Sequence, residues 1–182
     1  MNINFSPFPI LETARLRLRQ ISATDVEEVY AMRSNPETMR YIPRPIAKKR
    51  EDALAHIALL ESCVNDNTAI NWGITFEGED KVIGIIGLLR MQLENFRTEI
   101  GYILTPAQHG KGIMAEAVKV VIDYAFEVLK FHSLEAVIDP ANTASENLLK
   151  RTGFVKEAHF KENFFYDGAF LDTVIYSLLN PK

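Results

Sequence analysis

The sequence has little cysteine and no long apolar run. Its 182 residues include one cysteine, Cys63, so an internal disulfide framework is excluded and a reducing compartment is favoured. No apolar run approaches the roughly 20 residues that a transmembrane helix requires. The N-terminal residues lack the basic and apolar regions of a signal peptide. We therefore expect a cytoplasmic protein that does not associate with a membrane.

Dense positive charge and metal-ligand patterns are also missing. The chain has 20 Lys and Arg against 24 Asp and Glu, a net charge of −4, which argues against nucleic acid as the main partner. The one basic triplet, Lys48-Lys49-Arg50, is interpreted as a solvated helix start. The histidines lack metal-ligand spacing, so no metal is expected. Length and an apolar fraction of 47% fit one domain over residues 1–182, with monomer and homodimer both open.

Hydrophobic periodicity and turn residues predict an α/β (α+β) chain. The expected helices cover 26–35, 48–65 and 113–130, with a further short helix opened by the capping pattern Thr143-x-x-Glu146. Residues 37–47 are predicted to be irregular. The expected strands cover 11–21, 69–76, 82–91, 98–104, 134–138, 154–165 and 170–179.

This element order predicts a mixed, mostly antiparallel sheet flanked by helices. Strands 99–104 and 134–138 are joined by one long helix, so they should form a central parallel β-α-β crossover. The open carboxyl ends of such a pair are the natural ligand crevice.

The stretch from Glu99 to Glu116 supplies the first functional hypothesis. A strand ends at Leu104, a turn with Gly110 follows, and a helix begins after Gly112. Such a helix start leaves backbone N–H groups unpaired at the positive end of the helix dipole, which suits an anion. Glycine also lets a ligand approach the backbone closely. We expect a nucleotide-type ligand whose phosphates lie on residues 110–114.

Spacing removes two other nucleotide motifs. The turn does not match G-x-x-x-x-G-K-[ST] of a P-loop, and it lacks the third glycine of a dinucleotide-binding fingerprint. Taken alone, Gly-x-Gly is better interpreted as a plain turn and helix cap.

Two longer blocks carry a family resemblance. The first is Glu99-Ile-Gly-Tyr with Gly110-Lys-Gly-Ile-Met-Ala-Glu-Ala117, and the second is Asn142-x-x-Ser145 followed by Gly153-Phe154. With the element order, they make nearly the whole chain resemble a GNAT-superfamily N-acetyltransferase of the ribosomal-protein N-terminal branch. The resemblance implies transfer of acetyl from acetyl-CoA to a primary amine, on a protein or peptide N-terminus or a small molecule. The alternative is a non-catalytic acyl-CoA-binding or sensing protein.

The resemblance also implies which residues bind acetyl-CoA. Pyrophosphate would lie on backbone amides, the pantetheine arm would pair with main-chain groups, and two side chains would contact the rest of the arm. The pyrophosphate would contact His109, Gly110, Lys111, Gly112, Ile113 and Met114. The main-chain groups that pair with the pantetheine arm belong to Ile103 and Leu104. The two side chains are those of Asn142 and Ser145. The family motif Arg/Gln-x-x-Gly-x-Gly/Ala matches only at Gly112. Backbone binding tolerates the other two residues, although Met114 should demand more room beside the ligand.

The resemblance implies two catalytic side chains. Glu99 is the candidate general base. Equally, Glu99 could be a structural partner that pairs with Arg15, Arg17 or Arg97. Ser145 matches a serine proposed to protonate the leaving thiolate, while hydrogen bonding to the cofactor or capping a helix is its other interpretation. Leu149 occupies the position of the family's frequent tyrosine acid.

One further glutamate is a weaker candidate base. Phe164 occupies the position of a glutamate proposed as base in one related enzyme, and Glu162 lies two residues away on the same expected strand face.

Overall fold

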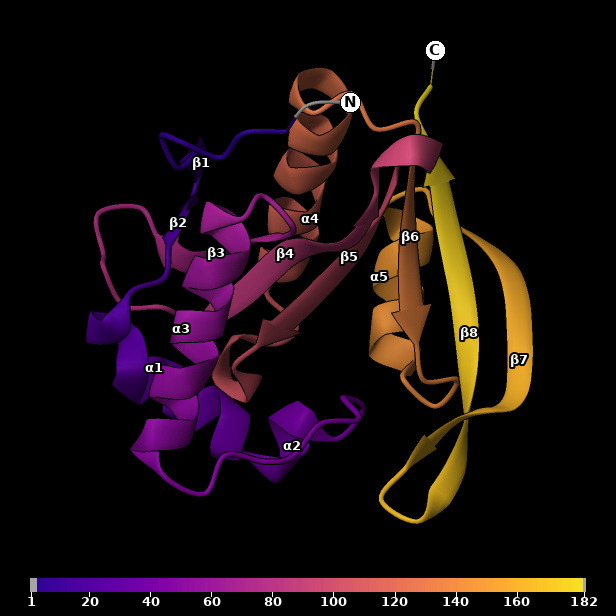
Figure 1. Cartoon of the computed structure of the whole chain (residues 1–182), viewed down its shortest axis with the longest axis horizontal. Coiled ribbons are helices and arrows are strands. Elements are labelled where there is room, and N and C mark those ends of the chain that lie inside the picture. Colours follow the sequence, from indigo (N-terminus) through magenta and orange to yellow (C-terminus); the bar gives the residue numbers. More distant parts are fainter. Residues whose placement is uncertain (1–2, 182) are drawn as a thin grey trace.

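The computed structural model describes residues 3–181, which build one eight-stranded sheet with helices on both faces (Figure 1). The strand order is β1-β2-β3-β4-β5-β6-β8-β7. The strands are β1 (Leu11–Glu12), β2 (Leu16–Gln20), β3 (Ile70–Phe76), β4 (Gly84–Gln92), β5 (Arg97–Leu104), β6 (Ser133–Ile138), β7 (Val155–Tyr166) and β8 (Ala169–Leu179). The α-helices are α1 (Val26–Ser34), α2 (Pro36–Met39), α3 (Arg50–Asn65), α4 (Ile113–Asp123) and α5 (Thr143–Arg151).

The predicted parallel crossover is confirmed at the centre of the sheet. Strand β5 leads through α4 to β6, and these two strands pair in parallel, whereas the other neighbouring strands pair antiparallel. The parallel register covers Arg97↔Ser133, Thr98↔Leu134 and Glu99↔Glu135. Beyond these pairs the strands separate, and Figure 1 shows β5 and β6 diverging toward their carboxyl ends.

The two faces of the sheet have separate hydrophobic clusters. Helix α4 packs Val118 and Val121 against Trp72 of β3 and Ile100 of β5 in the larger cluster. The opposite face is covered by α1 and α3. On β5, Tyr102 packs with the α4 cluster and Ile103 with the α1–α3 cluster. Because side chains alternate along a strand, Glu99 points to the α1–α3 face.

The long helix after the glycine turn differs in its last part from the prediction. The α-helix ends at Asp123 and continues as a π-helical turn over Tyr124–Val128, whereas a helix to residue 130 was expected. The ring of Tyr124 stands edge-on to Trp72, with centroids 5.5 Å apart. Hydrophobic spacing alone does not distinguish α-helical from π-helical turns, so the sequence pattern could not predict this π-helical turn.

Two local predictions were wrong because asparagine acted as the helix cap. Residues 36–39 form the short helix α2 inside a stretch expected to be irregular, since Asn35 Oδ1 accepts from the N–H groups of Glu37 and Thr38 and Pro36 suits the first helical position. Likewise Asn142, not Thr143, caps α5 by accepting from Ser145 N at 3.1 Å.

The expected carboxyl-terminal hairpin is present. Strands β7 and β8 pair antiparallel around the turn at Asp167 and Gly168, which have φ values of 48° and 81°. In Figure 1 its tip extends past the end of β6 on the side where β5 and β6 separate. Within residues 3–181, none of the helices is long and apolar enough to cross a bilayer.

Strands β3 and β4 are closely packed at Gly87, and a substitution there tests how tightly the sheet centre is packed. A Cβ atom on Gly87 would lie 2.6 Å from the carbonyl oxygen of Ile70 and would collide with the buried Asn71 side chain. We expect Gly87→Ala to lower the free energy of unfolding by about 2–3 kcal/mol, because backbone and a buried amide must move. Urea unfolding measures this loss.

Gly101 is the matched control, because it pairs directly with Gly87 across β4 and β5. A Cβ atom there meets only the Leu89 side chain, at 3.1 Å, which can rotate. Gly101→Ala should cost less than about 1 kcal/mol. Equal losses for the two variants would contradict the packing argument.

Candidate active site

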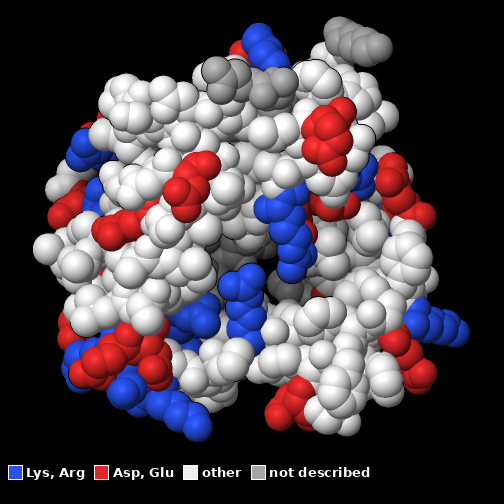
Figure 2. Space-filling view, in the orientation of Figure 1, with Lys and Arg blue, Asp and Glu red and all other residues white. Residues whose placement is uncertain are grey.

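The candidate site lies where β5 and β6 separate. The last parallel pair joins Glu99 and Glu135, and the next residues of β5 have no partner on β6. Figure 2 shows a hollow near the centre of this side of the molecule, with Lys or Arg side chains above and below it. The opening therefore combines free strand edges with charged walls.

The predicted glycine turn lies at the carboxyl end of β5. Gly110 and Gly112 both have φ of 75°, a left-handed conformation that favours glycine. Gly112 is the N-cap residue of α4, and no side chain in the described part of the chain caps that helix. Unpaired N–H groups at the start of an 11-residue helix suit the phosphate group expected there, although its binding stays a prediction.

An arginine from the start of the chain braces this turn. The Arg15 Nε atom lies 2.8 Å from Glu116 Oε2, and its Nη1 atom donates to the Lys111 carbonyl at 3.3 Å. Thr13 Oγ1 donates to the other Glu116 oxygen at 2.5 Å. Sequence reasoning offered Arg15 as a partner of Glu99, so its pairing with Glu116 corrects that alternative. Arg15 and Glu116 are about 100 positions apart, and only the fold brings them together.

The other residues of the turn point in different directions. The Met114 side chain is buried in the α4 cluster, so the expected crowding of the ligand was wrong. His109 is exposed, and its Nε2 atom lies 3.1 Å from the carbonyl oxygen of Leu104. Lys111 Nζ donates to Gln108 Oε1 at 3.1 Å. The Leu104 carbonyl oxygen, which was expected to pair with the pantetheine arm, is therefore already in contact with the His109 ring.

Glu99 is buried at the base of the opening and paired with Arg90. Its exposed fraction is 8%, and Arg90 Nη1 lies 2.5 Å from Glu99 Oε2. Burial raises the pKa of Glu99 above its usual value, more than Arg90 lowers it, and the neighbouring Glu135 raises the pKa further. A carboxyl group with a raised pKa can accept a proton near neutral pH.

The partner of Glu99 was missed because a bulge in β4 determines it. The β4–β5 register shifts between Leu89 and Gln92, so two residues of β4 lie opposite Thr98. In this bulge Arg90 has φ of 46° and its side chain reaches Glu99. The proposed partner Arg97 instead pairs with Glu135 at 2.8 Å, and the nearest acid to Arg17 is Glu12, at 3.9 Å.

Ser145 is connected to the strand that carries Glu99. Its Oγ atom lies 2.6 Å from the Tyr102 hydroxyl, which bridges the gap between α5 and the separated part of β5. Burial raises the pKa of Tyr102 to about 12, so the phenol keeps its proton and can donate. Tyr102 stands in the recognised Glu-Ile-Gly-Tyr block, but its link to Ser145 was not predicted. Leu149, at the usual tyrosine position, is fully buried.

The second candidate base is not part of this constellation. Glu162 is exposed in β7 with φ of 50°, and its N–H group donates to Asp172 Oδ1 at 2.8 Å. Among residues 3–181, its side chain makes no hydrogen bond or ion pair. Across the same residues, no group of three or more His, Cys, Asp or Glu side chains could hold a metal ion.

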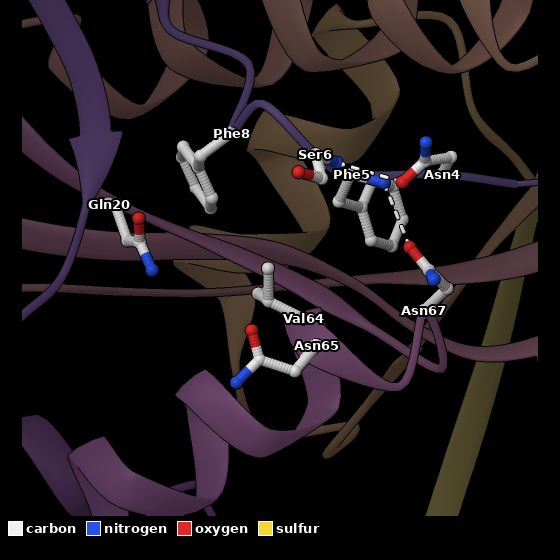
Figure 3. Close-up of a pocket in the computed structure, with 8 residues that line it drawn as sticks. All are labelled: Asn4, Phe5, Ser6, Phe8, Gln20, Val64, Asn65 and Asn67. Atoms are coloured by element: carbon white, nitrogen blue, oxygen red, sulfur yellow. Dashed lines mark hydrogen bonds between the residues drawn. The ribbon is translucent and has the colours of Figure 1, made fainter.

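A separate pocket of about 210 Å³ lies between the N-terminal segment and the end of α3 (Figure 3). Its lining has no ionisable side chain and consists of Asn4, Phe5, Ser6, Phe8, Gln20, Val64, Asn65 and Asn67. Figure 3 shows the Asn67 side chain accepting a hydrogen bond from Phe5 N, at 2.8 Å. These contacts fasten the N-terminal segment to the sheet and offer no acid, base or nucleophile.

Comparison with known proteins identifies the family. The model of the acetyltransferase (GNAT) domain matches residues 15–155. The uncharacterized N-acetyltransferase YoaA of Bacillus subtilis is 34% identical over 175 residues, which cover 96% of this chain and 99% of YoaA. The chain therefore belongs to the GNAT acetyltransferase family, and the resemblance predicted from its motifs is confirmed.

Two solved structures support the fold and the branch. Ribosomal-protein-S5-alanine acetyltransferase from Vibrio fischeri has a TM-score of 0.82 and 26% identity, covering 96% of this chain and 98% of that one. Spermidine N-acetyltransferase from Vibrio cholerae, solved with CoA and spermine, has a TM-score of 0.80 and 23% identity, covering 92% and 97%. The first is similar in sequence and fold, and the second shows the fold.

Gly112 allows the phosphate site to be tested. A Cβ atom there would meet only Arg15 Nη2, at 3.7 Å, so the chain leaves room for a side chain although the backbone disfavours it. We expect Gly112→Trp to weaken equilibrium binding of acetyl-CoA by at least about 100-fold, because the indole would occupy the phosphate position.

Gly78 is a suitable control, because its φ of 78° imposes the same strain in a turn with open space around it. Gly78→Trp should lose similar stability and bind acetyl-CoA as the wild type does. Unchanged binding in Gly112→Trp would exclude the turn as the phosphate site.

Proposed function

We propose that this acetyltransferase moves the acetyl group of acetyl-CoA to a primary amine by direct attack on the thioester. The amine belongs to a protein or peptide N-terminus or to a small molecule. The observation that carries the proposal is the buried Glu99 at the point where β5 and β6 separate, with the glycine turn at the other end of the same opening. Residues 1–182 act as one catalytic domain in this proposal, as a monomer or a homodimer.

Acetyl-CoA would lie along the opening. Its pyrophosphate would rest on the amides of residues 109–114, with Arg15 adding positive charge beside Gly112. The pantetheine arm would run past Ile103 and Leu104 toward Asn142 and Ser145, like a strand added to β5. The Vibrio cholerae enzyme, which was solved in complex with CoA, supports a cofactor of this kind in this fold.

The reaction needs proton transfers at the nitrogen and at the sulfur. The amine arrives largely protonated, Glu99 takes its proton, and the free nitrogen attacks the thioester carbonyl. The new N–C bond forms, the C–S bond breaks, and the sulfur leaves as a thiolate. The nitrogen would lose its second proton to water as the amide forms, while Ser145 would give the thiolate a proton and regain one from water through the Tyr102 hydroxyl at 2.6 Å. Holding both substrates in one opening can itself supply about 7–11 kcal/mol of the barrier.

The buried carboxylate favours catalysis over sensing. A protein that only binds acyl-CoA has no use for an acid residue that is costly to bury and whose pKa is raised. Glu99 also has an alternative role as a structural partner of Arg90. The pH dependence of the reaction separates these roles.

Glu99→Gln tests the base and the function together. With acetyl-CoA and a panel of amines and N-terminal peptides, the wild type should release free CoA thiol. We expect Glu99→Gln to lower kcat/KM by about 100-fold at pH 7, with a smaller deficit at high pH, where the amine loses its proton unaided. An unchanged pH–rate profile would exclude Glu99 as the base.

Glu135→Gln is the matched control, since Glu135 is the opposite carboxylate in the parallel pair and has its own arginine. It should retain activity. Because Glu135 raises the pKa of Glu99, its neutralisation lowers that pKa and moves the rise of the rate to lower pH. Absence of CoA release with every amine, together with normal acetyl-CoA binding, would favour the sensing protein.

Ser145→Ala tests the proposed acid. We expect kcat to fall about tenfold with an unchanged dissociation constant for acetyl-CoA, because the thiolate loses its proton donor. In Tyr102→Phe the serine hydroxyl remains, so the fall should be smaller. Weaker acetyl-CoA binding in Ser145→Ala, with kcat preserved, would instead assign Ser145 to cofactor binding.

A further inference from the structure

One wall of the opening has a concentration of positive charge. Residues 33–50 contain six Lys and Arg but only one Glu, in a chain whose net charge is −4. Arg33, Arg40 and Arg44 form no salt bridge with any residue that the structure describes. The charges of these three arginines are therefore not neutralised by an ion pair within the described chain, whereas Arg50 is paired with Glu27.

Two of these arginines and a histidine are brought together by the fold. Arg33 lies in the last turn of α1 and is half-buried. Its carbonyl oxygen accepts from Ala47 N at 3.0 Å, which fastens the loop carrying Arg44 to α1. His56 of α3 lies within reach of both guanidinium charges. Burial and these two charges lower the pKa of His56 to about 4, so the imidazole is neutral at pH 7. Burial and Arg44 likewise lower the pKa of Arg33.

The same loop lies next to the candidate base. Glu99 points to the α1–α3 face, and the charge of Arg44 acts on it in the same direction as that of Arg90, favouring the ionised carboxylate. Figure 1 places α2 and the chain that follows it beside the open end of β5, and Figure 2 shows basic side chains bordering the central hollow. Arg44 is thus near enough to the opening for its charge to act on the Glu99 carboxylate.

The acids on this wall do not balance these charges. Glu99 is paired with Arg90 and Glu135 with Arg97, so each already has its own guanidinium group. Two neighbouring guanidinium charges repel each other, and an anion between them would relieve that repulsion. A polycation such as spermidine would bring further positive charge to this place, whereas arginine pairs hold carboxylate and phosphate groups in a bidentate geometry.

We propose that the amine acceptor carries an anionic group, a carboxylate or a phosphate, that Arg44 and Arg33 bind while the amine reaches Glu99. This inference rests on the proposed acetyl transfer and specifies its acceptor. Arginine binding of the anion orients the amine, and it selects against polyamines by repulsion.

The test compares amines whose second group differs in charge, with 4-aminobutyrate and 4-aminobutanamide as the matched pair. The probes are 4-aminobutyrate, its neutral analogue 4-aminobutanamide, 2-aminoethyl phosphate and spermidine. We expect at least about tenfold higher kcat/KM for an anionic amine than for the neutral amide, and the lowest value for spermidine. The carboxylate and phosphate arms identify which anion is preferred. Preference for spermidine or for the neutral amide would overturn the proposal.

Arg44→Gln locates the selectivity. This exposed side chain can be changed without disturbing the core, and the melting temperature checks that the fold persists. We expect KM for the preferred anionic amine to rise about tenfold, with kcat/KM for the neutral amide within about twofold of the wild type. The control is Arg151→Gln, an exposed arginine at the end of α5, which should leave both values unchanged.

The result also separates this inference from the proposed function. An equal loss for all amines in Arg44→Gln would mean that Arg44 acts only through Glu99, and the anion site would be excluded. Absence of acetyl transfer with every amine would overturn the proposed function. In that case, calorimetry can still test the anion site by measuring how tightly 2-aminoethyl phosphate binds to the wild type and to Arg44→Gln. Equal binding to the two proteins would reject the anion site.

Discussion

The structure depends on a parallel strand pairing that stops early. Strands β5 and β6 share only three paired positions, the last at Glu99 and Glu135, and then separate. The remaining residues of β5 keep their hydrogen bonds to β4 on one side, so the strand stays extended while its other edge is open. An open edge inside a sheet is normally costly, because buried backbone groups need partners. A ligand that pairs like an added strand would meet this need, and this is the position proposed above for the pantetheine arm of acetyl-CoA.

The last parallel pair also creates the electrostatics of the site. It places two carboxylates opposite each other in a partly buried position, where the charge of Glu135 raises the pKa of Glu99. Each is balanced by a separate arginine, Arg90 from the bulge of β4 and Arg97 from β5 itself. Arg90 is the charged partner of the buried Glu99 carboxylate, so the bulge and the carboxylate depend on each other. The same arrangement that keeps Glu99 buried raises its pKa toward the range useful for a base.

The two ends of the opening handle charge differently. At the glycine turn, Arg15 and Glu116 form a closed pair that holds the backbone, and the proposed anion site consists of N–H groups at the helix start. At the other end, Arg33 and Arg44 have no acidic partner among the described residues, and the backbone between them is fixed by the Ala47–Arg33 hydrogen bond. The first arrangement suits a ligand that is the same in every reaction cycle and that is bound by the protein backbone. The second suits recognition of a variable acceptor by side chains.

The sequence by itself determined the order of the main helices and strands, the parallel crossover, the glycine turn and the family. These features rest on local signals, namely hydrophobic period, glycine position and short motifs. Such signals are present in the sequence and do not depend on tertiary contacts. Boundaries failed where a cap or a bulge decided them, as at Asn35 and Asn142. The tertiary structure alone decided the partners. Arg90 reaches Glu99 through a bulge, Arg15 reaches Glu116 across about 100 residues, and Tyr102 reaches Ser145 from another element, because such contacts follow from three-dimensional packing and leave no period or spacing in the sequence.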